Sequence, residues 1–351
     1  MNRHKNILVV RTDRVGDVVL TLPVINLIKR YIPDSHLYFL ANSYTEDLLK
    51  GNSALEKVFV LKTKFCENYR ELKKHKIDTV ITVSPNFRLA LLFFLLRIRY
   101  RIGTGYRWYS FLFNKKHYEH RRYGDKHETE YNINLLKMID IQPEYIFSFP
   151  IPITNEDISN VTEIMNRRGL SKSDKIIIIH PGTGGSAIDL PKEKMIYLTK
   201  QIALNSGFKI CFTGSSGERE LVNELNSAIA MKGYSFAGEL NLRELAELIR
   251  RSKIFISNST GPIHIAAVVG THIIGFYPPV KAMSVNRWGP YTEKKNIFIP
   301  QLNDDNHNGS NDQECKKCIQ TKCRYFNCMD LIPVEAVINK INEILNKRDS
   351  I

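Results

Sequence analysis

The sequence predicts an α/β protein of two domains, each built on a parallel sheet. Short apolar runs alternate with helical stretches, which is the pattern of strands joined by crossover helices. At 351 residues the chain is long enough for two hydrophobic cores. The alternation stops at a segment with three prolines, residues 141–157, and then starts again. We therefore expect an N-terminal domain over 1–155, a boundary over 156–172, a C-terminal domain over 173–330 and a closing helical segment over 331–351.

The chain opens with a strand, a polar turn and a helix. Residues 7–10 are apolar and predict the strand, and the apolar residues of 18–28 recur at helical spacing. Asp17 lies between them. Ligands of open α/β sheets bind beyond the carboxyl ends of the strands, so Asp17 is a candidate catalytic carboxylate facing a cleft. An acid in the first turn of a helix also complements the helix dipole, so a capping role stays open.

The rest of the first half continues the alternation. The predicted strands are 37–40, 58–61, 79–83 and 101–103, and the predicted helices are 44–50, 66–76, 89–97 and 127–139. The longest apolar run, Leu89–Leu96, is flanked by arginines and is too short to span a bilayer, which takes about 20 residues.

The second half begins with the clearest buried-strand signal, the run of isoleucines in 175–180. Asn241 and Glu244 predict a capping box at the start of a helix. The further predicted strands are 208–212, 234–237, 253–256 and 272–276, and the predicted helices are 157–168, 191–205, 218–231, 242–251, 262–269 and 334–345.

Three strand-to-helix turns of the second half are rich in Gly, Ser and Thr: 181–186, 214–217 and 257–261. Such turns expose backbone N–H groups that bind phosphate oxygens. None matches a dinucleotide fingerprint or a P-loop, but three in one sheet, with His264 one turn into the next helix, indicate a nucleotide site. No Asp-x-Asp occurs, so a metal-bridged pyrophosphate site has no support and we expect no metal. No Gly-x-Ser-x-Gly occurs either, which argues against an α/β-hydrolase.

The formal net charge is +14, and basic residues gather with aromatic ones between Arg97 and Lys126. Such a mixture can bind single-stranded nucleic acid. It can equally hold a phosphorylated glycolipid head group against a membrane surface, or be a plain solvated face. The apolar run near the N-terminus is too short for a signal peptide, so we expect a cytoplasmic protein.

Four of the six cysteines form a C-x2-C-x4-C-x4-C cluster: Cys315, Cys318, Cys323 and Cys328. Four thiols this close can hold zinc, although the spacing matches no standard finger or ribbon. A disulfide is disfavoured in a reducing cytoplasm. We favour reduced thiols in a packed loop and leave the metal open.

Several separated stretches resemble glycosyltransferase family 9, the ADP-heptose:lipopolysaccharide heptosyltransferases. Arg11–Pro23 resembles the opening of the family, and Ser257–Ala267 resembles its donor-site signature. Between them, His180–Ala187 matches the loop of the second domain, and Cys323–Pro333 matches the tail. The resemblance covers nearly the whole chain in the right order.

The resemblance implies a GT-B fold, in which two Rossmann-like domains face each other across a cleft. The acceptor would bind the N-terminal domain and the nucleotide sugar the C-terminal one, and the last helix would pack back toward the N-terminal domain. Transfer in the family proceeds with inversion and without a metal, so the cofactor expectation is none beyond the donor. Asp17 matches the proposed general base.

The resemblance also supplies donor and acceptor residues. Backbone N–H groups at the start of a helix would stabilise the leaving diphosphate, and an acid would bind the ribose. The donor residues are then Thr183, Gly184, Glu218, Ser259, Thr260, Gly261 and His264, and the acceptor residues are Arg14 and His127.

Two departures from the family pattern follow the loop of the second domain. The usual basic residue is replaced by Ile188 and the usual Trp by Leu190. Lys192 or Lys194 would compensate for a lost phosphate contact, or the donor differs from ADP-heptose.

We expect an inverting, metal-independent glycosyltransferase. It would move a heptose, from ADP-heptose, to a lipopolysaccharide core or related surface glycan. Its partners would be the nucleotide sugar and an anionic glycolipid, with peripheral contact at the inner membrane face and no nucleic acid. The alternatives are another nucleotide sugar, a family member without activity, and a non-enzymatic basic protein that binds nucleic acid.

Overall fold

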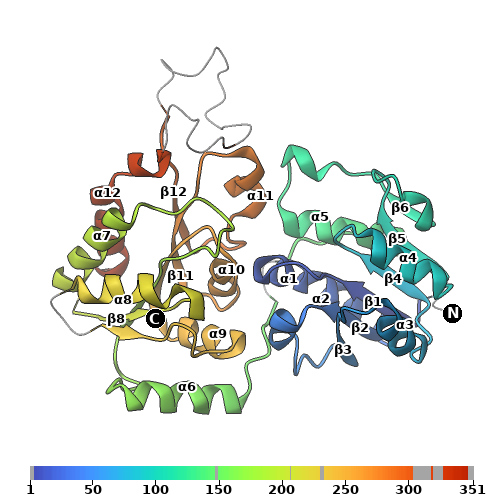
Figure 1. The fold of residues 1–351 in the computed structure, drawn as a ribbon, viewed down its shortest axis with the longest axis horizontal. Helices are drawn as coiled ribbons and strands as arrows, with labels where there is room; N and C mark the ends of the chain where they lie inside the picture. Colours follow the sequence, from blue (N-terminus) through green and yellow to red (C-terminus); the bar gives the residue numbers. More distant parts are fainter. Residues whose placement is uncertain are drawn as a thin grey trace. The chain divides into compact units, whose positions relative to one another are not determined.

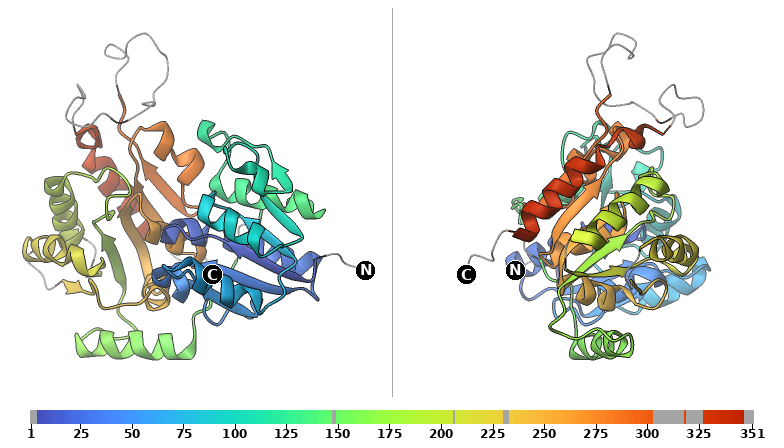
Figure 2. Two further views of the ribbon diagram at one scale, coloured as in Figure 1. Left: turned by 45° about the vertical axis from the view of Figure 1, so that its right-hand side comes forward. Right: turned by 90° about the vertical axis from the view of Figure 1, so that its left-hand side faces the viewer.

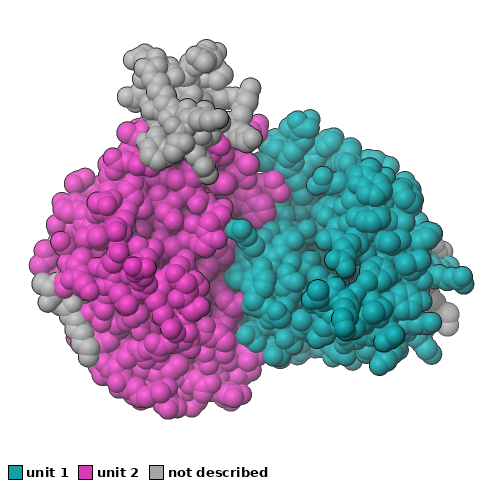
Figure 3. Space-filling view, in the orientation of Figure 1, with its two compact units in different colours: residues 1–152 teal, residues 153–351 magenta. Residues whose placement is uncertain are grey.

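The computed structural model describes residues 4–146, 149–205, 207–229, 233–302, 318 and 327–346. The chain divides into two compact units, residues 1–152 (unit 1) and 153–351 (unit 2), which Figure 3 distinguishes by colour. Each unit contains one parallel six-stranded sheet, so the predicted α/β class is confirmed.

The sheet of unit 1 has the strand order β3-β2-β1-β4-β5-β6. In this order the chain reverses direction across the sheet between β1 and β4, which is the switch point where ligands of such folds bind. The edge strand β6 was not predicted, because its Lys-Lys-His sequence is polar and exposed. The strands are β1 (Asn6–Val10), β2 (His36–Ala41), β3 (Lys57–Val60), β4 (Thr79–Thr82), β5 (Tyr100–Thr104) and β6 (Lys115–His117).

The helical pattern over 18–28 is two helices and not one. Pro23 has no N–H and stands in the first turn of the second helix, which begins at Leu22 after the N-cap Thr21. The helices of unit 1 are α1 (Val15–Val19), α2 (Leu22–Tyr31), α3 (Phe65–Lys73), α4 (Phe87–Leu95) and α5 (Glu128–Asn134), with 3-10 turns η1 (Ser43–Leu48), η2 (Ser110–Leu112), η3 (Arg121–Tyr123) and η4 (Leu135–Ile139).

The sheet of unit 2 repeats the same order of strands, as β12-β11-β10-β7-β8-β9, with its switch point between β7 and β10. We had expected 272–276 to be the last strand, but β12 follows it and pairs with β11. The strands are β7 (Ile176–His180), β8 (Lys209–Phe212), β9 (Tyr234–Ser235), β10 (Ser252–Asn258), β11 (His272–Phe276) and β12 (Lys295–Phe298).

The capping box predicted at Asn241 is present at the start of α9, with Glu244 as its acid. The helix α6 belongs to unit 2, where Asp157 pairs with Arg243 of α9 at 3.1 Å. The helices are α6 (Asn155–Arg167), α7 (Lys192–Asn205), α8 (Arg219–Ser227), α9 (Leu242–Arg250), α10 (Gly261–Val268), α11 (Val285–Trp288) and α12 (Val334–Asn346), with 3-10 turns η5 (Ser216–Glu218), η6 (Lys281–Met283) and η9 (Cys328–Leu331).

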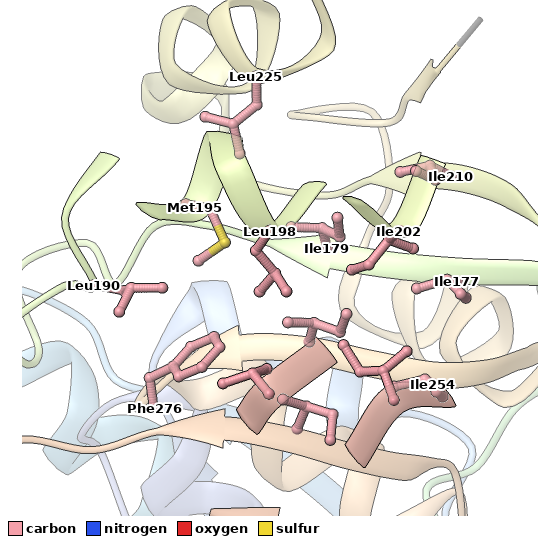
Figure 4. Packing of buried hydrophobic residues seen from close by; sticks show 14 of the residues in the cluster. Ile177, Ile179, Leu190, Met195, Leu198, Ile202, Ile210, Leu225, Ile254 and Phe276 are labelled. Atoms are coloured by element: carbon pink, nitrogen blue, oxygen red, sulfur yellow. The ribbon is translucent and has the colours of Figure 1, made fainter. Parts of the chain in front are cut away.

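One face of the unit 2 sheet packs on α7 and α12. Figure 4 shows Ile177 and Ile254 of the sheet and Leu198 of α7 within this core. The buried residues of α12, from Val334 to Ile344, belong to the same cluster, and Figure 2 shows α12 in red at its right-hand view. The apolar face of α12 is therefore used within unit 2, and packing of this helix toward the N-terminal domain stays a prediction.

No helix among the described residues is long and apolar enough to cross a membrane.

Candidate active site

Asp17 lies in α1, directly after the turn that follows β1 (Figure 1). Its carboxylate pairs with the guanidinium of Arg11, which is the first residue beyond β1 and is almost fully buried. Its second oxygen accepts the backbone N–H of Arg14 at 3.2 Å. Asp17 thus fulfils the capping role, while 16 % of its side chain remains exposed to solvent.

Arg11 is the centre of a larger ionic network in unit 1. It lies 2.9 Å from Asp13 and 3.1 Å from Glu128, which is buried at the start of α5. Arg121 binds the same Glu128 oxygen at 2.5 Å. Asn132 of α5 donates to the carbonyl of Leu20 at 3.0 Å and so holds α5 against the segment that carries Asp17.

The network contains three carboxylates and two guanidinium groups. Burial raises the pKa of the Asp17 carboxyl, the Arg11 guanidinium opposes this, and the Asp13 and Glu128 carboxylates add to the rise. The pKa of Asp17 therefore lies above its ordinary value. A carboxylate with a raised pKa is a stronger base than an ordinary one, which suits acceptance of a proton from a hydroxyl group.

In unit 2 the loops after β7 and β10 meet at the switch point of the sheet. Asn258, the last residue of β10, donates to the carbonyl of Pro181 at 2.6 Å and accepts the N–H of Leu190 at 2.9 Å. The hydroxyl of Ser186 donates to the carbonyl of Ser259 at 3.2 Å. These bonds fix the glycine-rich loop 181–186 beside the start of α10.

Glu218 joins the third loop to the first. Its carboxylate accepts the N–H of Ser215 at 2.7 Å and the N–H of Gly184 at 3.2 Å. A Cβ at position 182 would lie 2.0 Å from a carboxylate oxygen of Glu218, so any residue other than glycine would displace this carboxylate from its hydrogen bonds. Burial raises the pKa of Glu218, but the hydrogen bonds from Ser215 and Gly184 outweigh it and hold that pKa below its ordinary value. The acid is therefore ionised and already bonded within the protein.

His180, the last residue of β7, lies beneath these loops. It is hydrogen-bonded to the hydroxyl of Thr213 at 3.0 Å. Burial lowers the pKa of His180 to about 4, although Glu218 opposes this, so the ring is neutral at physiological pH.

The start of α10 offers fewer amide donors than expected. The N–H of Ser259 donates to the carbonyl of Phe276 at 2.9 Å, which extends the strand pairing of β10 with β11. This N–H is therefore already bonded within the protein, and contact of Ser259 with a donor stays a prediction. No hydrogen bond is recorded from the N–H of Thr260 or Gly261 to any described residue, and α10 has no side-chain cap. These two groups are therefore available to an anion at this helix terminus.

Thr183 belongs to the loop after β7, and His264 belongs to α10. Thr183 is buried and its hydroxyl donates weakly to the carbonyl of Ala187 at 3.4 Å. His264 is buried within α10, with 5 % of its surface exposed. The structure thus brings Thr183, Gly184, Glu218, Thr260, Gly261 and His264 to one edge of the sheet, and ligand contact by any of them stays a prediction.

The two departures from the family pattern have a packing explanation. Leu190 is buried in the core of unit 2 and Ile188 packs against it. Both lysines already have partners: Lys192 pairs with Glu224 at 2.8 Å, and Lys194 donates to the carbonyls of Asp330 and Ile332. Compensation by either lysine stays a prediction.

The predicted acceptor residues occupy different settings. Arg14 is exposed beside Asp17. His127 is the N-cap of α5, where its Nδ1 accepts the N–H of Thr129 at 3.2 Å, so it caps this helix. Contact of either residue with an acceptor stays a prediction.

The basic cluster is only partly a surface. Arg121 faces Glu128, Lys126 pairs with Glu119 at 2.5 Å, and Arg101 donates to the carbonyls of Ile98 and Leu112. Arg97, Arg99, Arg107, Lys115, Lys116 and Arg122 are exposed.

Cys315 and Cys323 lie outside the described residues, so the structure does not address the cysteine cluster. Within the described part of the chain, no group of three or more His, Cys, Asp or Glu side chains is placed to hold a metal ion.

Sequence reasoning missed Arg11, Glu128 and Asn132. Arg11 stood in the motif that we quoted, and its position directly after a buried strand was the available signal. Nothing local marks Glu128 or Asn132 as its partners, because they lie more than a hundred residues away.

Comparison with known proteins gives one consistent result. The model of glycosyltransferase family 9 (heptosyltransferase) matches residues 67–325. A putative glycosyltransferase of Haemophilus influenzae is 27 % identical over 84 % of this chain and 89 % of its own length. The lipopolysaccharide core heptosyltransferase OpsX of the same organism is 24 % identical over 97 % of each chain.

Solved structures with the same fold include two full-length matches. The glycosyl transferase family 9 protein from Veillonella parvula superposes with a TM-score of 0.83 at 21 % identity, over 99 % of both chains. The E. coli ADP-heptose lipopolysaccharide heptosyltransferase II gives 0.78 at 19 % identity, over 97 % of this chain and 98 % of that one.

Proposed function

This chain belongs to glycosyltransferase family 9, and from that premise we propose that it transfers a heptose from ADP-heptose to the core of a lipopolysaccharide or a related surface glycan. It is a glycosyltransferase of the heptosyltransferase type. The observation that carries the finer proposal is the meeting of three Gly-, Ser- and Thr-rich loops at the switch point of the unit 2 sheet. These loops offer amide and hydroxyl groups to a diphosphate.

The proposed chemistry begins at Asp17. Its carboxylate accepts the proton of the acceptor hydroxyl while the oxygen attacks the anomeric carbon of the donor. Attack from the side opposite the leaving diphosphate inverts that carbon. Arg11 holds the carboxylate in place, and burial keeps its pKa high enough to take the proton.

The leaving nucleoside diphosphate gains negative charge as its bond to the sugar breaks. The N–H groups of Thr260 and Gly261, at the positive end of α10, would donate hydrogen bonds to this diphosphate. Thr183 adds a hydroxyl group from the neighbouring loop. Since these groups meet the charge by hydrogen bonding, we propose that no metal takes part.

Nucleotide selectivity tests this proposal directly. A nucleotide that binds the folded protein raises its melting temperature by mass action. If the donor is ADP-heptose, ADP should therefore give the largest shift in a thermal-shift panel of ADP, UDP, GDP and CDP. His264→Ala and Thr183→Val should each weaken the ADP-induced shift. Measuring the shift relative to each variant's own melting temperature separates binding from stability. His272→Ala serves as the control, because His272 stands at the opposite end of the sheet, where β11 begins.

The outcomes separate the alternatives. Preference for another nucleotide would keep the glycosyltransferase and discard ADP-heptose as donor. No shift with any nucleotide would bring forward the inactive family member. Salt-sensitive binding of single-stranded DNA without any nucleotide effect would favour the nucleic-acid-binding protein.

The raised pKa of Asp17 predicts the acid side of the pH profile. Asp17 must be ionised to act as a base, so kcat/KM should fall as the pH falls through its pKa, at a higher pH than for an ordinary Asp, whose pKa is about 3.9. Asp13→Asn removes a carboxylate that raises this pKa, so the acid limb should move to lower pH. An acid limb that Asp13→Asn leaves in place would contradict this origin.

A further inference from the structure

The helix α4 is apolar on both of its faces. Leu89, Leu92 and Phe93 are buried against the sheet of unit 1. On the other side, Phe87, Phe94 and Leu95 are exposed, with Leu91 half-buried between them. The positions 87, 91, 94 and 95 share one side of a helix. A helix that is apolar all round is normally buried, but 38 % of Phe87 and 46 % of both Phe94 and Leu95 remain exposed here.

Two aromatic side chains next to α4 extend this face. Trp108 is 73 % exposed and Phe111, in η2, is 66 % exposed. The Trp108 ring lies 4.8 Å from that of Phe87. Tyr109, Leu112 and Phe113 anchor the segment in a small core with Ala90 of α4. We call Phe87, Leu91, Phe94, Leu95, Trp108 and Phe111 the outer apolar face.

The segment that carries the outer apolar face has charges of one sign. Residues 79–118 contain five Arg and two Lys and neither Asp nor Glu. Six of these seven cations are exposed: Arg88, Arg97, Arg99, Arg107, Lys115 and Lys116. An apolar face within a rim of Lys and Arg is the composition of helices that lie in the interface of an anionic bilayer.

We propose that the outer apolar face is the surface by which this protein docks on a bilayer of anionic phospholipids, with Trp108, Phe111 and the exposed side of α4 entering the interface and the arginines contacting lipid phosphates. The proposal deepens the proposed function and rests on it for the reason why a bilayer is the partner, since the acceptor there is a glycolipid.

The position in the fold suits this role. The helix α4 begins after the carboxyl end of β4, and Trp108 follows the carboxyl end of β5. Asp17 follows the carboxyl end of β1, which pairs with β4. The docking surface therefore starts at the sheet edge that carries the proposed base, where a membrane-anchored acceptor has to arrive.

Two other occupants fit less well. A second copy of this chain would bring two rims of like charge together. Single-stranded nucleic acid would use the arginines and stack on the aromatic rings, but it offers nothing to Leu91 and Leu95.

Vesicle binding tests the proposal without any transfer reaction. In the Trp288→Phe protein, Trp108 is the single remaining tryptophan and reports on its own surroundings. Its emission should shift to shorter wavelength with vesicles of phosphatidylcholine and phosphatidylglycerol in equal amounts, and stay unchanged with phosphatidylcholine alone.

Cosedimentation with the same vesicles measures affinity. It should show that Trp108→Ser/Phe111→Ser weakens binding about tenfold for each side chain. Arg97→Gln/Arg99→Gln should weaken it about fivefold for each charge.

Matched substitutions in unit 2, three of them in α7 and one at Lys172 before β7, provide the control. Tyr197→Ser/Leu204→Ser removes two exposed apolar side chains, and Lys172→Gln/Lys200→Gln removes two exposed charges. Both should bind the vesicles like the unaltered protein, and all variants should keep the ADP-induced thermal shift. The proposal would be overturned if variants of the outer apolar face and control variants lost vesicle binding equally. It would also be overturned if no form of the protein bound vesicles, or if the protein bound single-stranded DNA in preference to vesicles. A protein that binds vesicles but no nucleotide would refute the proposed function and not the docking surface.

Discussion

Asp17→Asn should abolish most of the transfer activity while the donor still binds. Loss of a positioned general base typically slows a reaction by two to four orders of magnitude, so kcat should fall by a factor on the order of 10²–10⁴. Asparagine keeps the shape of the side chain and can still accept the N–H of Arg14, which the carboxylate accepts at 3.2 Å. Little stability should therefore be lost. The ADP-induced thermal shift should remain, because the donor loops belong to unit 2.

Asp13→Asn is the matched control for this experiment. Asp13 also contacts Arg11, at 2.9 Å, and its side chain is 36 % exposed. If Asp17 acts only by holding Arg11, the two substitutions should reduce kcat to a similar degree. If Asp17 is the base, Asp13→Asn should keep kcat within a few-fold at pH values above the acid limb. Near-normal transfer by Asp17→Asn would remove Asp17 from the mechanism.

Arg11→Met should destabilise unit 1 more than any other single exchange discussed above. Arg11 is buried and pairs with Asp13, Asp17 and Glu128, and Glu128 itself is 1 % exposed. Removing one partner of a buried ion pair leaves an uncompensated charge and costs about 3–5 kcal/mol. Urea-dependent hydrogen exchange of the β1 amides measures this free energy of unfolding for unit 1 by itself.

Two further variants identify the cause of that loss. Arg11→Met/Glu128→Gln should recover part of the stability, because it also removes the buried carboxylate charge. Arg101→Met removes a half-buried arginine that donates only to the carbonyls of Ile98 and Leu112. It should cost about 1–3 kcal/mol, the penalty for unsatisfied neutral acceptors. A double variant as unstable as Arg11→Met would show that packing of the side chain, and not its charge, stabilises the unit.

Local sequence patterns predicted most of the strands and helices. The apolar runs at 7–10 and 175–180 form the central strands β1 and β7, since a strand covered on both faces has to be apolar throughout. The two missed strands, β6 and β12, begin with lysine and lie at sheet edges, where burial imposes no such pattern. Pro23 is a local signal for the break between α1 and α2, because proline favours the first turn of a helix.

The candidate site was predictable as a set of motifs and not as a set of bonds. The glycine-rich turns and Asp17 were found because backbone N–H groups and carboxylates have local signatures. That the N–H of Ser259 is already used by Phe276 depends on how β10 pairs with β11. That Glu218 accepts the N–H of Gly184 depends on the closeness of two loops 34 residues apart.

By itself, then, the sequence determined the α/β class, the two-unit organisation, the family and the residue types at the switch points. These follow from periodicity and from short motifs, which neighbouring residues carry together. Only the tertiary structure decided which charges are exposed: it paired Arg11 and Arg121 with Glu128 and left Arg97, Arg99 and the outer side of α4 at the surface. The physical reason is that burial and ion pairing depend on distances between residues that are far apart in the chain, which no local pattern contains.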